Sequence, residues 1–236
     1  MHEERADTPT EQNVESKLFA VSVRHHLGSV AVNLASSSGF ALLTWRDGGG
    51  VGLWYGVALA ISALRLLLHV ALFKPAIRHA ETTIPRLAAI RWIYRMGLIA
   101  SVSVWAYLAA FVMPGLALED RYALVIIVSA LAGGAMGVFA PDLTLGRIYI
   151  SVVMLPATVS LALLDRTDTV LAGLGGVFYL VMLSGLRTNH AALVQSLNYA
   201  FENTELLRRL KLRAVEAEAV NAELERRVRE RTLTLE

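Results

Sequence analysis

The side chains that could do chemistry inside an apolar part of this sequence are Arg65 and His69, spaced one helical turn apart. A guanidinium is a fixed fork of donors that stays charged, whereas an imidazole can both donate and accept a hydrogen bond. A charge inside an apolar segment is costly unless it finds a partner or reaches the surface. Two interpretations of Arg65 follow: it extends to the lipid headgroups, or it lines a polar pocket that tethers a ligand or sets a switch. The second needs a carbonyl, a hydroxyl or Asp142 as partner, because the apolar segments hold no acid.

Other candidates for the ligand or switch role lie in the later apolar segments: Trp105, Tyr107 and Pro156. Pro156 would leave the carbonyl of Val152 without its helical donor and bend the helix. Kinks of this kind often lie beside cavities in membrane helices. We expect a small polar cavity there, lined by Ser101, Ser103, Tyr107, Thr158 and Ser160.

Metal and cofactor chemistry has little support in this sequence. The absence of cysteine excludes disulfides, thiolate catalysis, zinc–thiolate sites and iron–sulfur clusters. Imidazole is a common metal ligand, yet no histidine pair among His25, His26, His69 and His79 has a carboxylate at ligand spacing. We interpret these histidines as surface residues near headgroups, and we expect no catalytic residue, metal or cofactor.

The elements that hold these residues are predicted to be membrane-spanning helices. Apolar residues make up 55% of the chain and come in blocks, with a mean hydropathy of +0.51. A helix of about 20 apolar residues crosses a bilayer. Six stretches qualify, of which the first is the most polar: 29–45, 51–73, 96–114, 122–140, 148–164 and 170–186. The first ends in Trp45-Arg46 rather than a small-residue cleavage site, which indicates a retained span.

The distribution of positive charge predicts the orientation of these spans. Lysine and arginine accumulate on the cytoplasmic side, and here they lie before the first span, after the last and in the 74–95 connection. Both termini are therefore predicted on the cytoplasmic side of an inner membrane. The outer connections are too short to fold into a ligand-binding domain, so a stimulus must be read in the membrane, at its surfaces or from the cytoplasm. The net charge of only +2 argues against a nucleic-acid partner.

Two local patterns concern packing. Residues 11–26 place Val14, Leu18 and Val21 on one helical face, which predicts either a short amphipathic helix on the inner surface or an extension of the first span. Small residues recur at helical spacing in two spans, where they let helix backbones approach. We interpret them as packing sites within the chain, with a dimer contact as the alternative: Ser129, Gly133, Gly137, Ala172 and Gly176.

From about residue 188 the pattern becomes a heptad repeat in a helix without proline or glycine. Seven residues form the predicted seam at positions a and d: Leu207, Leu210, Ala214, Ala217, Asn221, Leu224 and Val228. Asn221 at an a position favours a parallel, in-register dimer, although Arg231 interrupts the seam. The alternative is one amphipathic helix packed on another element.

The sequence resembles a known class at this point. The run Phe201-Glu202-Asn203-Thr204-Glu205-Leu206-Leu207-Arg208-Arg209-Leu210 is similar to the juncture after the last span of bacterial multi-domain sensors. The run Ala222-Glu223-Leu224-Glu225-Arg226-Arg227-Val228-Arg229-Glu230-Arg231-Thr232 is similar to the connector before their kinase or cyclase modules. With Arg65, Trp92, Trp105, the small residues of the fourth span and Pro156, residues 14–236 resemble the six-span input region of sensor histidine kinases, hybrid kinases and GGDEF-type diguanylate cyclases.

The resemblance implies an all-α, polytopic membrane protein of three parts. Residues 1–26 would be a cytoplasmic, partly amphipathic segment, 27–187 a six-helix transmembrane sensor domain, and 188–236 a cytoplasmic signalling coiled coil leading to an output domain that is missing here. We expect a homodimeric input module of a histidine kinase, which implies a kinase module and a response regulator downstream. The alternatives are a diguanylate cyclase or phosphodiesterase input module, or, in a different class, a small transporter or an anchor.

Overall fold

The computed structural model describes residues 9–45, 51–78, 84–164 and 166–233, and within these ranges every regular element is a helix. This confirms the all-α class. The chain divides into two units, Met1–Leu193 and Val194–Glu236, each described by itself.

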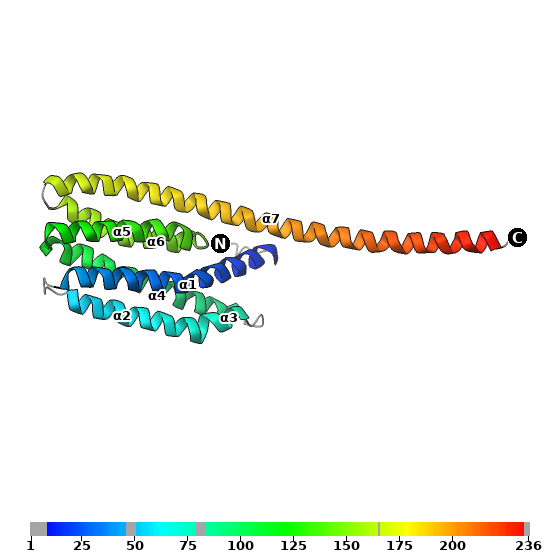
Figure 1. The fold of residues 1–236 in the computed structure, drawn as a ribbon, viewed down its shortest axis with the longest axis horizontal. Helices are drawn as coiled ribbons and strands as arrows, with labels where there is room; N and C mark the ends of the chain where they lie inside the picture. The colour runs from blue at the N-terminus through cyan, green and yellow to red at the C-terminus, as the bar shows by residue number, and fades with distance from the viewer. Residues whose placement is uncertain (1–8, 46–50, 79–83, 165, 234–236) are drawn as a thin grey trace, which may run out of the picture. The chain divides into compact units, whose positions relative to one another are not determined.

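Seven α-helices make up most of the described chain (Figure 1). Short turns of π- or 3₁₀-helix continue α2 over His69–Phe73 and α4 over Leu108–Val112 and Met113–Gly115. The α-helices have these bounds: α1 Pro9–Leu43, α2 Val51–Leu68, α3 Lys74–Arg78, α4 Ile84–Tyr107, α5 Leu118–Val138, α6 Leu143–Ala162 and α7 Arg166–Leu233.

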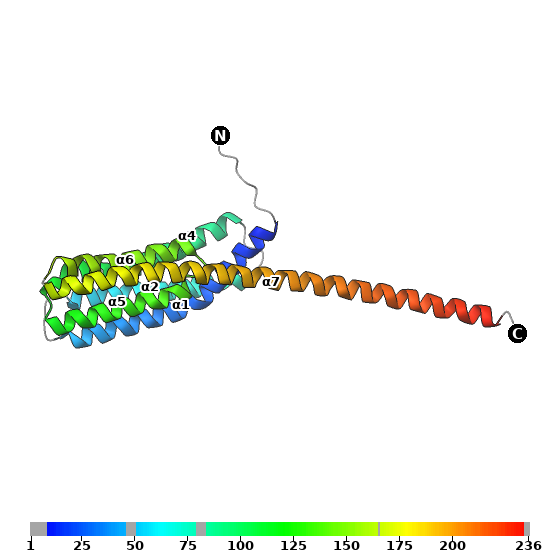
Figure 2. The same cartoon turned by 90° about the horizontal axis from the view of Figure 1, so that it is seen from above.

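The long helices of the first unit lie side by side in one bundle (Figures 1 and 2). Helix α1 packs against α2 and α5, α4 packs against α2 and α6, and α5 packs against α6. The first part of α7 joins them through Leu186, which is fully buried against Gly146 of α6. Three helices, α1, α2 and α4, therefore share one interior, and that interior holds the candidate site.

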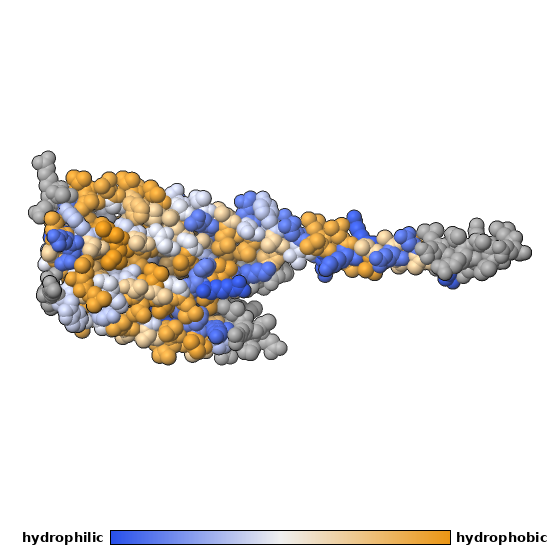
Figure 3. Space-filling view, in the orientation of Figure 1, coloured by the Kyte–Doolittle hydropathy of each residue, from blue (hydrophilic) through white to orange (hydrophobic). Residues whose placement is uncertain are grey.

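Five of the helices are long and apolar enough to cross a membrane. They are Val51–Ala76, Ala88–Gly115, Leu118–Val138, Leu143–Ala162 and a stretch within Asp168–Ala222. Their outward faces carry large apolar side chains such as Leu53, Ile126 and Val177, each more than half exposed. Figure 3 shows apolar residues spread over the visible face of the bundle.

Helix α1, which contains the predicted first span, is not one of these five. The polar residues that lower its mean hydropathy include Ser22, His26 and Ser37, which face the interior. The opposite face exposes large apolar residues, among them Val32 at 56% and Leu42 at 76%. The mean hydropathy of the whole helix does not show this division between faces, since it counts inward and outward residues alike.

The N-terminal segment belongs to the same helix. Helix α1 runs without a break from Pro9 to Leu43, so residues 11–26 extend the first predicted span rather than forming a separate surface helix. Its buried apolar residues here are Phe19 and Val23, while Leu18 and Val21 are half-buried. The side chain of Val14 lies outside the described residues.

Close helix packing occurs at other glycines than the predicted ones, whereas Ala172, also among the predicted residues, is buried in the core. Added Cβ atoms at Gly133, Gly137 and Gly176 would meet nothing within 4 Å, which overturns the interpretation of these glycines as packing sites within the chain. A Cβ at Gly146 would instead lie 2.8 Å from Leu186 Cδ2, and one at Gly185 would lie 2.5 Å from Met136 Sδ. Which face of a helix meets a neighbour depends on its rotation in the bundle, and small-residue spacing alone does not set that rotation.

This difference predicts an asymmetric response to added volume. We expect Gly146→Val to destabilise the bundle by about 1–3 kcal/mol, the usual range for overpacking, because its side chain would overlap Leu186. The matched change Gly137→Val should have less than half that effect. Thermal unfolding of both variants in detergent measures the difference. Equal losses of stability in the two variants would contradict the assignment of Gly146, rather than Gly137, as a position of close helix packing.

Candidate functional site

Arg65 is a buried residue in the middle of the α1–α2–α4 interior, with 2% of its surface exposed. Its Nη1 donates a hydrogen bond to Ser101 Oγ of α4, and its Nη2 donates one to Ser29 Oγ of α1, each at 3.1 Å. The interpretation in which Arg65 extends to the headgroups is therefore wrong. Of the partners considered from the sequence, hydroxyls are the ones it meets.

A pair of stacked imidazoles lies one turn from Arg65. His26 of α1 and His69 have ring centroids 5.2 Å apart and planes within 9° of parallel. Phe73 and Tyr94 pack against the His26 ring with centroids 5.3 and 5.4 Å away. Both histidines are more than nine-tenths buried, and neither Nδ1 atom has a hydrogen-bond partner. His26 is thus an interior residue and not the surface histidine expected from the sequence.

The other end of the interior is closed by two tryptophans. Trp105 is fully buried and its Nε1 donates to Asn33 Oδ1 of α1 at 3.3 Å. Trp54 packs edge-on against it with centroids 5.1 Å apart, and its own Nε1 donates to the carbonyl of Val104 at 2.8 Å. We call the set His26, Ser29, Asn33, Arg65, His69, Ser101 and Trp105 the polar core.

Three of the predicted site residues, Arg65, His69 and Trp105, therefore belong to one site. Tyr107 does not belong to it, because 53% of its surface is exposed and its ring packs with Phe111 at a centroid distance of 5.4 Å. Pro156 is half-buried within α6, outside the three helices of the polar core, and α6 stays helical across it.

The sequence-based prediction missed the contribution of α1. Its inward residues Ser22, His26, Ser29, Asn33 and Ser37 are spaced by four, three, four and four residues, which is one face of a helix. That periodicity was a usable signal, because polar residues on one face of an otherwise apolar helix indicate an inward side.

The polar core brings together groups that donate and accept hydrogen bonds between helices. It offers a guanidinium, two imidazoles, hydroxyls and an amide, all held between helices. In the described ranges there is no group of three or more His, Cys, Asp or Glu side chains that could hold a metal ion.

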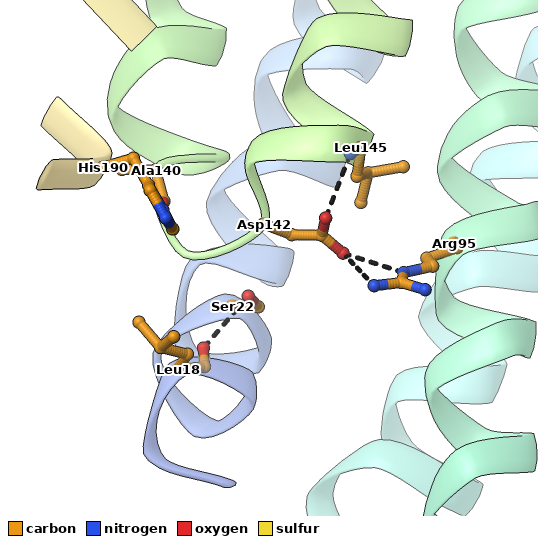
Figure 4. Close-up of polar contacts among 7 residues, drawn as sticks. All are labelled: Leu18, Ser22, Arg95, Ala140, Asp142, Leu145 and His190. Atoms are coloured by element: carbon orange, nitrogen blue, oxygen red, sulfur yellow. Dashed lines mark hydrogen bonds and ion pairs between the residues drawn. The ribbon is translucent and has the colours of Figure 1, made fainter. Parts of the chain in front are cut away.

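A second polar group ties the α5–α6 turn to its neighbours (Figure 4). Asp142 Oδ2 accepts from Arg95 Nε and Nη2 of α4 at 2.8 and 2.7 Å, while its Oδ1 caps α6 by accepting from Leu145 N at 3.0 Å. His190 Nδ1 of α7 bonds the carbonyl of Ala140 at 2.7 Å. The turn is thus attached to α4 on one side and to α7 on the other.

A buried ion pair lies at the opposite end of the bundle. Arg121 Nη1 pairs with Asp168 Oδ2 near the start of α7, and Arg121 Nη2 donates to the carbonyl of Leu116 at 3.3 Å. Asp168 is 1% exposed and Arg121 9%. This pair fastens the start of α7 to α5.

The second unit, taken alone, is a helical segment whose predicted seam is exposed. Leu207 and Leu210 are 59% and 61% exposed, and Ala214, Ala217 and Asn221 are exposed as well. The side chains of Leu224 and Val228 lie outside the described residues. Glu205 pairs with Arg208 and Arg209 of the same helix, and the hydrogen bond from Arg209 with the charge of Arg208 holds the pKa of Glu205 below its usual value.

Comparison with known proteins finds no family, no curated protein and no solved structure that matches this chain.

Proposed function

We propose that this chain is the membrane-embedded sensory input module of a bacterial histidine kinase, in which a stimulus changes helix packing and a parallel dimeric coiled coil relays the change. The recipient would be a C-terminal catalytic module outside this chain, acting in turn on a response regulator. A diguanylate cyclase or phosphodiesterase module is the alternative recipient, since its connectors have the same residue pattern.

The membrane part of this proposal rests on how the bundle divides its residues. Five helices are long and apolar enough to span a bilayer, and α1 turns its apolar face outward while its polar residues pack inward. An apolar exterior around an interior that holds the polar side chains is expected where lipid replaces water. Together with the arginine distribution, this favours six spans in the inner membrane with both termini in the cytoplasm.

The single observation that carries the signalling proposal is the exposed seam of the second unit. Leucines and alanines at heptad spacing are left uncovered along a helix that carries many charged residues and also exposes Leu206, Leu212, Val215 and Val220 outside the seam. Such a stripe is stable when it is buried against another helix, and Asn221 at an a position favours a second copy in parallel register. Small and polar seam residues allow alternative packings, which suits a relay.

The polar core is the place where we propose that the stimulus acts. The Arg65 guanidinium joins three helices through two hydroxyl contacts, and among the described residues it has no acid within hydrogen-bond distance. Hydrogen bonds to charged groups contribute about 1.5–3 kcal/mol each. Exchanging one such partner is therefore enough to shift a balance between two helix arrangements.

The experiment is the oligomeric state of the chain in nanodiscs, measured by mass photometry with and without residues 207–236. We expect a dimer that is lost on truncation. Leu210→Ser at a d position should weaken the dimer at least tenfold, because it removes two buried leucines per dimer. The matched control Leu212→Ser changes an equally exposed leucine at an f position and should leave the dimer intact.

A monomer both with and without residues 207–236 would contradict the proposed coiled-coil relay. That result would favour the alternative interpretations of the chain as an anchor or a transporter. If Leu210→Ser and Leu212→Ser changed the dimer affinity equally, the predicted seam would be wrong, although the chain would still be a dimer.

A further inference from the structure

The stacked histidines of the polar core join two helices at the end of the bundle that is predicted to face the cytoplasm. His26 belongs to α1, and His69 opens the π-helical turn that continues α2. Helices α1 and α2 lie side by side (Figures 1 and 2). The two ring planes are within 9° of parallel, with centroids 5.2 Å apart. This contact between α1 and α2 is therefore made by two groups that can each bind a proton.

The surroundings of the pair fit two uncharged rings. His26 is 1% exposed and His69 8%, and each has a buried Nδ1 atom without a hydrogen-bond partner. Phe73 and Tyr94 pack against the His26 ring with their own rings. An imidazolium donates from both nitrogens, and a buried charge is costly unless its donors are satisfied. A proton on either ring would therefore lack a hydrogen-bond acceptor at Nδ1 in the present packing.

The fixed charges that act on the pair are positive. Arg65, one turn before His69 on α2, acts on His26, and Lys74 acts on His69. Helix α5 also packs against α1, but its titratable side chains lie at residues 119–122, at the opposite end of the bundle. A proton on the pair would add a second positive charge near the buried guanidinium, and like charges repel each other.

The titratable groups of α4 and α6 leave this balance unchanged. The phenols of Tyr94 and Tyr149 lie close enough to act on Arg65, and a phenol is uncharged at physiological pH. Asp142, the acid that acts on Tyr94, is already bound to Arg95. These two helices therefore supply no free carboxylate to a protonated pair within the described residues.

We infer that the His26–His69 pair binds a proton from the side of the bundle that is predicted to be cytoplasmic, and that this proton weakens the packing of α1 against α2. A ring nitrogen accepts the proton with its lone pair, which forms an N–H bond and leaves an imidazolium. Imidazole is the side chain whose ordinary titration falls in the physiological range. A second proton binds less readily, because two stacked cations repel. Separation of the helices relieves the buried charge by exposing it to water.

Movement of α1 would also loosen its other contacts in this region. Ser29 Oγ accepts from Arg65 Nη2 at 3.1 Å, and the carbonyl of Ser22 accepts from the Tyr94 hydroxyl at 3.2 Å. A proton on the pair thus reaches α2 and α4 together. The proton is a stimulus only if the proposed function holds, whereas its binding by the pair does not depend on the coiled coil.

The test uses the full chain in nanodiscs between about pH 7.5 and 5, a range that spans the ordinary imidazole pKa. Magnetic resonance of isotope-labelled histidine side chains measures protonation, and we expect the pair to take up one proton. The chain has no cysteine, so Leu27→Cys and Val70→Cys attach spin labels at exposed positions next to the two histidines. We expect the distance between the labels to increase reversibly as the pH falls. A pair that stays uncharged, or a distance that does not change, would overturn the inference.

Variants locate the response. His26→Gln together with His69→Gln should abolish the pH-dependent change in label distance, because neither glutamine takes up a proton in this range. His25→Gln is the matched control, since His25 is the exposed neighbour of His26 on α1 and its loss should leave the change intact. Equal losses in the double variant and in His25→Gln would contradict the assignment. The titration of the parent chain needs no histidine variant, so it decides the question if the double variant does not fold.

Mass photometry at both ends of the pH range separates this inference from the coiled-coil relay. A chain that is monomeric throughout, and whose label distance still responds to pH, would contradict the relay and support the proton site. A dimer whose label distance is the same at every pH would support the relay and overturn the proton site.

Discussion

Replacing Asp168 by leucine is expected to destabilise the bundle by about 3–5 kcal/mol, the usual effect of removing one partner of a buried ion pair. Asp168 is 1% exposed, and its carboxylate is the acid that pairs with the Arg121 guanidinium. Without it, the hydrogen-bond partner that the described residues leave to Arg121 is the carbonyl of Leu116. The start of α7 would then lose its attachment to α5. Denaturant titration of the purified protein in mixed micelles measures the change.

Two further variants separate the ion pair from simple loss of packing. Arg121→Met combined with Asp168→Leu should return the stability to within about 1 kcal/mol of the parent protein, because both buried charges are gone. Glu119→Gln removes an exposed acid from the first turn of α5 and should change the stability by less than about 1 kcal/mol. If Asp168→Leu lowered the stability no more than Glu119→Gln, the Arg121 guanidinium would be hydrated in the variant, and the ion pair would not hold α7 in place.

The second large effect concerns the hydroxyls around Arg65. Ser29→Ala together with Ser101→Ala removes both hydrogen-bond acceptors of the guanidinium. A buried charge left without partners destabilises a protein by several kcal/mol, and we expect about 3–5 kcal/mol here. Adding Arg65→Met to the double variant should restore most of the loss, because no buried charge is then left without partners. Thermal unfolding in detergent compares the three proteins.

Ser103→Ala is the control for these hydroxyl changes. Ser103 lies two residues from Ser101 on α4, is exposed and bonds the carbonyl of Ile99 in its own helix. Its replacement should have an effect below about 1 kcal/mol. A double variant of Ser29 and Ser101 as stable as this control would show that Arg65 obtains its hydrogen bonds elsewhere, and the polar core would lose its role as the element that joins three helices.

Periodicity and composition were sufficient for the elements. Apolar blocks of spanning length predicted the long helices α2, α4, α5 and α6 and the apolar part of α7, and the structure confirms them as helices. Helix bounds were less accurate. The predicted third span begins at residue 96, whereas α4 begins at Ile84, because a helix continues past the apolar stretch wherever good helix formers follow or precede it.

The site was only partly predictable for a different reason. Arg65 and His69 were identified because a charge and an imidazole in an apolar segment are conspicuous. Their partners Ser29 and His26 come from α1, more than thirty-five residues earlier in the chain. Serine is common in helices of every kind, so its type carries little information about which neighbour it meets.

The sequence by itself determined what each helix is: its approximate length, its apolar blocks, its excess of arginine near one end of the bundle and the heptad pattern of the tail. Only the tertiary structure decided which face of each helix turns inward. That choice placed Arg65 between Ser29 and Ser101 rather than at the surface, put Gly146 rather than Gly137 against a neighbouring helix, and left Tyr107 outside the polar core. The physical reason is that helix formation depends on local hydrogen bonds and residue type, whereas rotation about the helix axis depends on the combined packing of side chains from several helices.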